Sequence, residues 1–312
     1  MDTLILGASG LAGSALARQM NTQGRKFVAP TSHELDLLDL SAFESFLAAS
    51  KINTIYFLAA KVGGAPANLS NPHGFLMKNL QMEINVLETS IKKRIPKLIF
   101  ISSSTIYPEF GQLPHTENEI LSGKLSPSVK PYALAKLVGM ELVQIAIEKY
   151  NLPWITAVPS NLYGINDNFR TNESHVIASI IRKLWVAKIE GRKVIEVLGE
   201  PNNSRDFLFS SDLASALLFV EKNYSGTSPI NIGPGKLTSI GNLANLLSEL
   251  MNYQVKINWN KKVIAPTSRK FLDNTKLRSL GFEEFTELRI GLNSVLKWLD
   301  NESLNNFKNV RW

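Results

Sequence analysis

The fold is decided by the stretch Thr3-Leu4-Ile5-Leu6-Gly7-Ala8-Ser9-Gly10-Leu11-Ala12-Gly13, where an apolar run leads directly into three evenly spaced glycines. The apolar run predicts a buried strand, and the residues that follow predict a helix. A glycine-rich turn between the two directs backbone N–H groups and the positive end of the helix dipole at one point, which favours a pyrophosphate. A glycine-rich turn without a ligand is the alternative. The residues expected to bind a dinucleotide here are Gly7, Ser9, Gly10, Leu11 and Ala12.

Apolar strands and amphipathic helices alternate through the first half of the chain. Further strands are expected over 26–29, 54–58, 97–102 and 154–158, and helices over 11–23, 41–50, 75–94 and 132–150. This alternation predicts an α/β fold, a Rossmann-type doubly wound parallel sheet in residues 1–158. Beyond it the pattern is less regular, with helices expected near 175–188, 212–222, 239–251 and 287–301. Residues 159–312 therefore predict mainly a smaller C-terminal α/β substrate-binding domain, with some segments returning to the first.

The composition narrows the possible partners. The net charge is +7, but Lys and Arg are spread along the 312 residues, and Lys92-Lys93-Arg94 is the densest run. We therefore expect attraction for small phosphorylated ligands and no nucleic-acid partner. No apolar run reaches membrane-spanning length, and the chain enters its first strand without a basic leader, so a cytoplasmic protein with no membrane partner is expected. The absence of cysteine excludes disulfides, thiolate nucleophiles and Cys-based metal sites, and no metal is expected.

Two separate segments, Ser102-Ser103-Ser104 and Tyr132-Ala133-Leu134-Ala135-Lys136, together suggest proton delivery. Residues four apart on a helix share a face, so Tyr132 and Lys136 can address one cleft. A neighbouring cation favours tyrosinate, so we expect Lys136 to lower the pKa of Tyr132 from its ordinary value near about 10. A serine hydroxyl at the end of the preceding strand could hold a carbonyl oxygen beside the phenol. Such a set would add a proton to a sugar oxygen, or remove one from it, while a hydride is transferred to or from the carbon.

The identity of the dinucleotide depends on the end of the second strand. This strand ends Ala29-Pro30-Thr31-Ser32-His33, without the acid that binds the ribose 2′-hydroxyl of NAD. NADPH is therefore expected, with its additional phosphate near Ser9, Ser32, His33 or a more distant cation. Asp36 and Leu37 are expected to meet the adenine, although a helix-start acid beside a core leucine would give the same pattern.

The glycine pattern of residues 7–13, with Ser103, Tyr132 and Lys136, resembles the extended short-chain dehydrogenases/reductases, most of which act on nucleotide sugars. Within that group the chain is very similar to the GDP-L-fucose synthase family, from the N-terminus to at least Asp273. Three stretches carry this resemblance: Ala59-Ala60-Lys61-Val62-Gly63-Gly64, Ser160-Asn161-Leu162-Tyr163-Gly164-Ile165-Asn166-Asp167-Asn168-Phe169 and Asn172-Glu173-Ser174-His175-Val176-Ile177.

The resemblance implies a role for each matching residue. Ser103, Tyr132 and Lys136 would drive reduction, and His175 would serve epimerisation. Arg205 and Lys183 would meet the diphosphate of a GDP-linked sugar. The further cofactor contacts implied are Ala59, Ala60, Lys61, Ser102, Tyr132, Lys136, Pro159, Asn161, Leu162 and His175. The substrate contacts implied are Ser103, Ser104, Thr105, Tyr132, Asn161, Val176, Lys183 and Arg205. A homodimer formed through the helices over 75–94 and 132–150 is also implied.

The chain departs from the family pattern at one catalytic position. The family has a cysteine two residues beyond the catalytic serine, where this chain has Thr105, and a Trp near the sugar where this chain has Leu198. A thiol with a pKa near about 8.5 can act as a base, whereas an aliphatic hydroxyl cannot without strong activation. We therefore expect an NADPH-dependent C4-reductase of a GDP-4-keto-sugar, of the 6-deoxyhexose or heptose type, with epimerisation weak or absent. The alternatives are a bifunctional 3,5-epimerase/4-reductase, a UDP-sugar 4-epimerase, and a binding or regulatory protein on the same fold.

Overall fold

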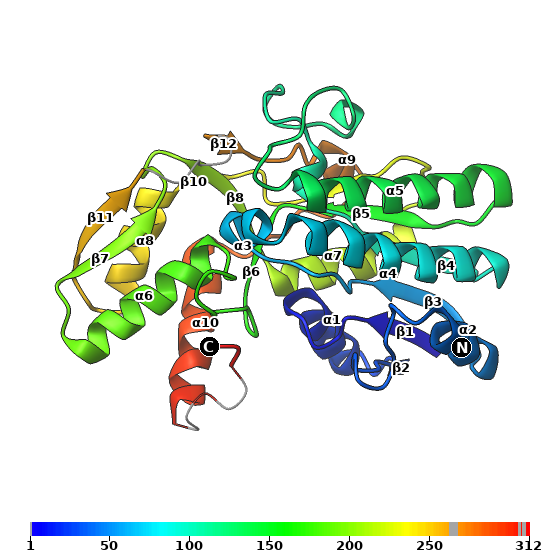
Figure 1. Ribbon diagram of the computed structural model, residues 1–312, viewed down its shortest axis with the longest axis horizontal. Coiled ribbons are helices and arrows are strands. Elements are labelled where there is room, and N and C mark those ends of the chain that lie inside the picture. Colours follow the sequence, from blue (N-terminus) through cyan, green and yellow to red (C-terminus); the bar gives the residue numbers. More distant parts are fainter. Residues whose placement is uncertain (1, 262–267, 305–306, 308–309) are drawn as a thin grey trace.

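The computed structural model describes residues 2–261, 268–304, 307 and 310–312. They form two lobes that lie side by side (Figure 1). One lobe is built on a six-stranded sheet, and the other is smaller and contains two short sheets. None of the described helices combines the length and the apolar composition that crossing a bilayer requires.

The large sheet is parallel throughout. Its strands run in the order β2 (Phe27–Val28), β1 (Asp2–Leu6), β3 (Ile52–Phe57), β4 (Lys97–Ile101), β5 (Ile155–Pro159) and β9 (Ile230–Ile232). The chain moves outward from β1 to β2 and then returns to β3 on the other side of β1, so the strand order reverses there. This confirms the predicted doubly wound α/β fold, in which ligands bind at the carboxyl edge near such a reversal.

Helices cover both faces of this sheet because its strands are apolar on both sides. Leu4 and Leu6 pack in one core cluster with α2 (Leu40–Ala49), α4 (Pro72–Lys92) and α5 (Lys130–Tyr150). Ile5, which points to the opposite face, packs with α1 (Leu11–Thr22) and α7 (Ser210–Asn223). The four helices predicted in the first half are confirmed, with ends that differ from the expected ones by at most three residues. The short α3 (Ala65–Ser70) was not predicted.

The smaller lobe is assembled from segments beyond residue 160. In it β8 (Ser204–Phe209) pairs with β6 (Asn161–Tyr163), β10 (Leu237–Ser239) and β12 (Arg269–Lys270), while β7 (Val194–Leu198) pairs with β11 (Lys256–Asn260). The helices α6 (Val176–Glu190), α8 (Ile240–Leu250) and α10 (Leu288–Ser303) share its core. The strand β9 and helix α7 also come from this half of the chain but belong to the large sheet and its cover. A division into domains at residues 158 and 159 stays a prediction.

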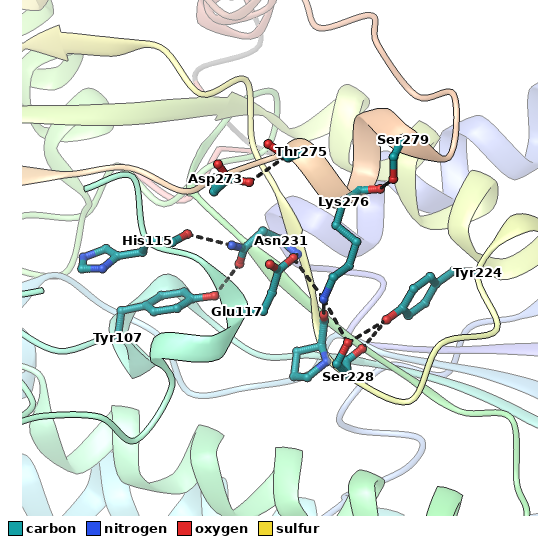
Figure 2. A network of polar contacts seen from close by, with 11 residues as sticks. Tyr107, His115, Glu117, Tyr224, Ser228, Asn231, Asp273, Thr275, Lys276 and Ser279 are labelled. Atoms are coloured by element: carbon teal, nitrogen blue, oxygen red, sulfur yellow. Dashed lines mark hydrogen bonds and ion pairs between the residues drawn. The ribbon is translucent and has the colours of Figure 1, made fainter. Parts of the chain in front are cut away.

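A polar network ties the segment after β4 to the outer edge of the sheet (Figure 2). The Tyr107 hydroxyl donates to Asn231 Oδ1 over 2.6 Å, and Asn231 Nδ2 donates to the carbonyl oxygen of His115 over 3.0 Å. The Asn231 backbone N–H donates to Glu117 Oε1 over 3.0 Å. Lys276, on α9 (Thr275–Ser279), lies 3.6 Å from the same carboxylate oxygen. Three segments distant in sequence are therefore joined around the buried Asn231.

We expect Asn231→Leu to lower the free energy of unfolding by about 1–3 kcal/mol, because it leaves the Tyr107 hydroxyl buried without a partner and removes one of the two hydrogen bonds to the His115 carbonyl. The control is Asn223→Leu on the exposed end of α7, which should change stability by less than about 0.5 kcal/mol. Urea denaturation of both variants measures the difference. Equal effects would contradict a supporting role for the network.

Candidate active site

A cleft of about 1230 Å³ runs along the carboxyl edge of the large sheet, with residues of both lobes in its walls. All residues assigned above to catalysis, cofactor or substrate line this cleft. Ser32 also lines it, whereas His33 is not among the lining residues. The structure thus brings the candidate residues together, although the role of each stays a prediction.

The turn between β1 and α1 has no room for side chains at two of its glycines. A Cβ on Gly13 would lie 2.1 Å from the Gly7 carbonyl oxygen, and one on Gly7 would lie 2.6 Å from the backbone nitrogen of Ala59. Gly7 also has φ +90°, which favours glycine. Gly10 caps α1 without a side-chain hydrogen bond to its first turn. The turn therefore presents bare backbone and a helix N-terminus, which fit the pyrophosphate of a dinucleotide.

The three predicted reduction residues come from two neighbouring elements. Ser103 follows β4, and Tyr132 and Lys136 lie one turn apart at the start of α5. Ser103 acts to lower the pKa of Tyr132, and both side chains line the cleft. Tyr132 is partly exposed towards the cleft, whereas Lys136 is only 2% exposed. The pair matches the arrangement predicted from the i, i+4 spacing.

Lys136 has a buried acidic partner on α4. Its Nζ lies 3.0 Å from Glu83 Oε1, and the two side chains are 2% and 1% exposed. Burial raises the pKa of Glu83. The pKa of Tyr132 is also raised, first by desolvation and then by the nearby Glu83 charge, with the Ser103 hydrogen bond acting in the opposite direction. The predicted lowering of the Tyr132 pKa is therefore wrong, because desolvation of the phenol and then the Glu83 charge both oppose its ionisation.

Glu83 was missed by the sequence analysis, although a signal for it exists. Phe75, Asn79, Glu83 and Leu87 are spaced four apart and share one face of α4, so a charged residue stands on a mostly buried face. Asn79, on the same face, accepts a hydrogen bond from the Lys61 N–H over 2.8 Å and donates to the Lys61 carbonyl over 3.0 Å. It thereby fixes the segment after β3 that lines the cleft.

The far part of the cleft is cationic. Arg205 on β8 is paired in register with Lys270 on β12, and both line the cleft. Burial lowers the pKa of Arg205 to about 10. Burial, and then the neighbouring Arg205, lowers the pKa of Lys270 to about 7. Two adjacent cations suit a diphosphate, whose binding would favour the charged lysine. The sequence analysis did not identify Lys270, which lies in a two-residue strand without periodicity.

His175 and Asn161 line the same cleft as the cationic pair and the glycine turn. His175 is the N-terminal cap residue of α6, and its imidazole is open to the cleft. It nevertheless lies deep enough among protein atoms that desolvation lowers its pKa, which favours the neutral ring. Asn161 Nδ2 donates to the Asp206 carbonyl oxygen over 3.2 Å. Asn161 thus connects β6 to β8 where the two lobes meet.

A doubly wound parallel sheet, a glycine turn at its first helix and a Ser–Tyr–Lys set at its carboxyl edge define an extended short-chain dehydrogenase/reductase. Comparison with known proteins agrees. The chain belongs to the NAD dependent epimerase/dehydratase family, which residues 3–233 match.

Individual relatives narrow the comparison. The chain is 37% identical to GDP-L-fucose synthase 1 of Arabidopsis thaliana over 295 residues, which cover 94% of this chain and 91% of the relative. A GDP-6-OMe-4-keto-L-xylo-heptose reductase from C. jejuni is 25% identical, with a TM-score of 0.91 and coverage of 96% and 98% of the two chains. A GDP-mannoheptose C4 reductase from Campylobacter jejuni with NADP bound is 28% identical, with a TM-score of 0.86 and the same coverage. The resemblance to GDP-L-fucose synthases predicted from the sequence is confirmed.

We expect Gly13→Ala to abolish dinucleotide binding, because the added methyl group would occupy the space of the Gly7 carbonyl. The matched control is Ser14→Ala, at the next position of α1, which adds no atoms and should bind as the parent does. Quenching of protein fluorescence by NADP⁺ measures both. Binding by Gly13→Ala within about threefold of the parent would overturn the assignment of the glycine turn.

Proposed function

We propose that the protein is an NADPH-dependent C4-reductase of a GDP-linked 4-keto-sugar, of the 6-deoxyhexose or heptose type. The observation that supports this most is that Ser103 and Tyr132 line the same cleft as the cationic pair Arg205 and Lys270. A sugar diphosphate can span such a cleft with its keto group at the hydroxyls. The NADP-bound GDP-mannoheptose C4 reductase and the GDP-L-fucose synthases among its relatives support the same chemistry. The protein is an NADP-dependent oxidoreductase.

The reduction converts a C4 ketone into an alcohol. The glycine turn and Lys136 would hold NADPH, which when bound would supply the hydride for C4. Ser103 donates a hydrogen bond to the ketone oxygen, and Tyr132 transfers its proton to the same oxygen as negative charge develops there. Desolvation raises the pKa of Tyr132, so the phenol keeps its proton until the reaction uses it. The charge left on the phenolate is stabilised by Lys136, whose Nζ lies 6.0 Å from the centroid of the Tyr132 ring.

Epimerisation at C3 or C5 needs a base that removes a proton beside the ketone. Thr105 lines the cleft where the resemblance places a cysteine, and its hydroxyl is a poor base. This supports a reductase with weak or absent epimerase activity. The bifunctional 3,5-epimerase/4-reductase is the second candidate, because His175 is open to the cleft and its lowered pKa favours the basic, neutral ring. A UDP-sugar 4-epimerase would instead retain NAD and need no added reductant.

We expect the purified enzyme to oxidise NADPH when supplied with GDP-4-keto-6-deoxy-mannose in D₂O, without incorporating deuterium at C3 or C5. NADPH absorbance follows the reduction, and mass spectrometry of the sugar follows the exchange. The matched variant is Thr105→Cys, in which a thiol should introduce measurable exchange. Failure to oxidise NADPH with this substrate and with a GDP-4-keto-heptose would refute the substrate class. Enzyme-dependent deuterium uptake in the parent would favour the bifunctional candidate.

We also propose a homodimer formed through α4 and α5, which pack against each other. Apolar side chains are exposed along both helices: Met77 and Ile84 on α4, and Leu134, Val138 and Ile145 on α5. Within each helix these residues are four, seven or eleven positions apart, which places them on one side of that helix. A second copy of this surface would cover them.

The cytoplasmic location stays a prediction.

We expect the parent to sediment as a dimer at micromolar concentration and Ile145→Glu to sediment as a monomer, because a charge cannot be buried at an apolar interface without cost. The control is Ile290→Glu on α10, where the isoleucine is 57% exposed but lies in the other lobe. Analytical ultracentrifugation measures all three. A monomeric parent, or dissociation caused by Ile290→Glu alone, would contradict this interface.

A further inference from the structure

Thr105 contacts the candidate catalytic serine directly. Ser103 caps the short 3₁₀ helix Ser104–Ile106 that follows β4. Its Oγ accepts a hydrogen bond from the Thr105 backbone N–H over 3.2 Å and another from the Thr105 hydroxyl over 3.0 Å. The residue that replaces the family's cysteine thus points a donor at the oxygen of Ser103.

A serine hydroxyl has one hydrogen to donate and two lone pairs to accept with. The two donors of Thr105 occupy both lone pairs of Ser103 Oγ. The hydrogen of Ser103 must then point away from Thr105. Ser103 and Tyr132 both line the cleft, and Ser103 acts to lower the pKa of Tyr132. The Ser103 hydrogen is therefore available to donate to a ketone oxygen that lies in the cleft beside the phenol.

We propose that Thr105 is a positioning residue, which orients the Ser103 hydroxyl so that it donates to the oxygen undergoing reduction. This inference rests on the proposed C4 reduction. A hydroxyl that can rotate spends part of its time accepting, and only a donating hydroxyl stabilises charge that develops on the ketone oxygen. Thr105 therefore contributes hydrogen-bond donors to the Ser103 hydroxyl, where the family's cysteine would contribute a base. The position that the resemblance assigns to the epimerisation cysteine would here serve the reduction.

A double-mutant cycle between Thr105 and Ser103 tests this. Thr105→Val keeps the shape of the side chain and removes the hydroxyl, and we expect kcat to fall about tenfold with KM changed less than about twofold. Thr105→Ser should recover most of that loss. In the Ser103→Ala background, Thr105→Val should lower kcat by less than about twofold further, because Thr105 acts through Ser103. A full additional tenfold loss in that background would show that Thr105 acts on the substrate itself and overturn the proposal.

Neutron diffraction of the deuterated parent protein provides a test that needs no turnover. The Thr105 deuteron should lie on the line to Ser103 Oγ, and the Ser103 deuteron should point at the Tyr132 oxygen. A Ser103 deuteron directed at Thr105 Oγ1 would refute the proposal. If the parent reduces no GDP-4-keto-sugar, the proposed function fails, and the neutron map still decides the role of Thr105.

Discussion

The parallel direction of the strands is the constraint on which this protein depends. Because neighbouring strands of the large sheet all run the same way, β1, β3, β4 and β5 end at one edge, and each releases a polar segment there. The glycine turn, the segment braced by Asn79, the serines after β4 and Asn161 are therefore neighbours although they are far apart in sequence. Helices on both faces bury the sheet and leave that edge as the place where a ligand can enter.

Electrostatic balance within the cleft decides how these residues can act. Lys136 is almost fully buried, and such an ammonium needs a counter-charge, which Glu83 supplies at 3.0 Å. The same carboxylate opposes ionisation of Tyr132. The phenol therefore stays protonated in the free enzyme and can act as the acid when negative charge develops on the ketone oxygen. In another part of the cleft, Arg205 and Lys270 lie in register, and burial and then the Arg205 charge lower the pKa of Lys270. A diphosphate would relieve that repulsion.

Much of the large lobe could be predicted, because β1, β4 and β5 are mainly apolar runs that are followed by glycine or serine. The smaller lobe could not be predicted at the same level. The sequence of β7 does not show its alternation of exposed and buried residues, because the exposed positions Val194 and Leu198 are apolar, and β12 has only two residues. Pairing partners and not local pattern therefore define both strands. Ser103, Tyr132 and Lys136 could be found because the end of a strand and an i, i+4 spacing on a helix can both be recognised in the local sequence. The pKa of Tyr132 was predicted in the wrong direction because it depends first on desolvation and then on Glu83, and both follow from tertiary packing, such as that of α4 against α5.

The network around Asn231 has a consequence for how such enzymes can be recombined. The segment between β4 and α5 is held by side chains of β9, and the Asp273 N–H before α9 donates to the His115 carbonyl over 2.8 Å. The segment between β4 and α5, the strand β9 and the start of α9 lie far apart in the sequence but form a single structural module. A chimaera that exchanges only the first stretch with a relative would separate a buried amide from its partners. Loop grafting in this fold therefore has to transplant β9 and the start of α9 together with the loop.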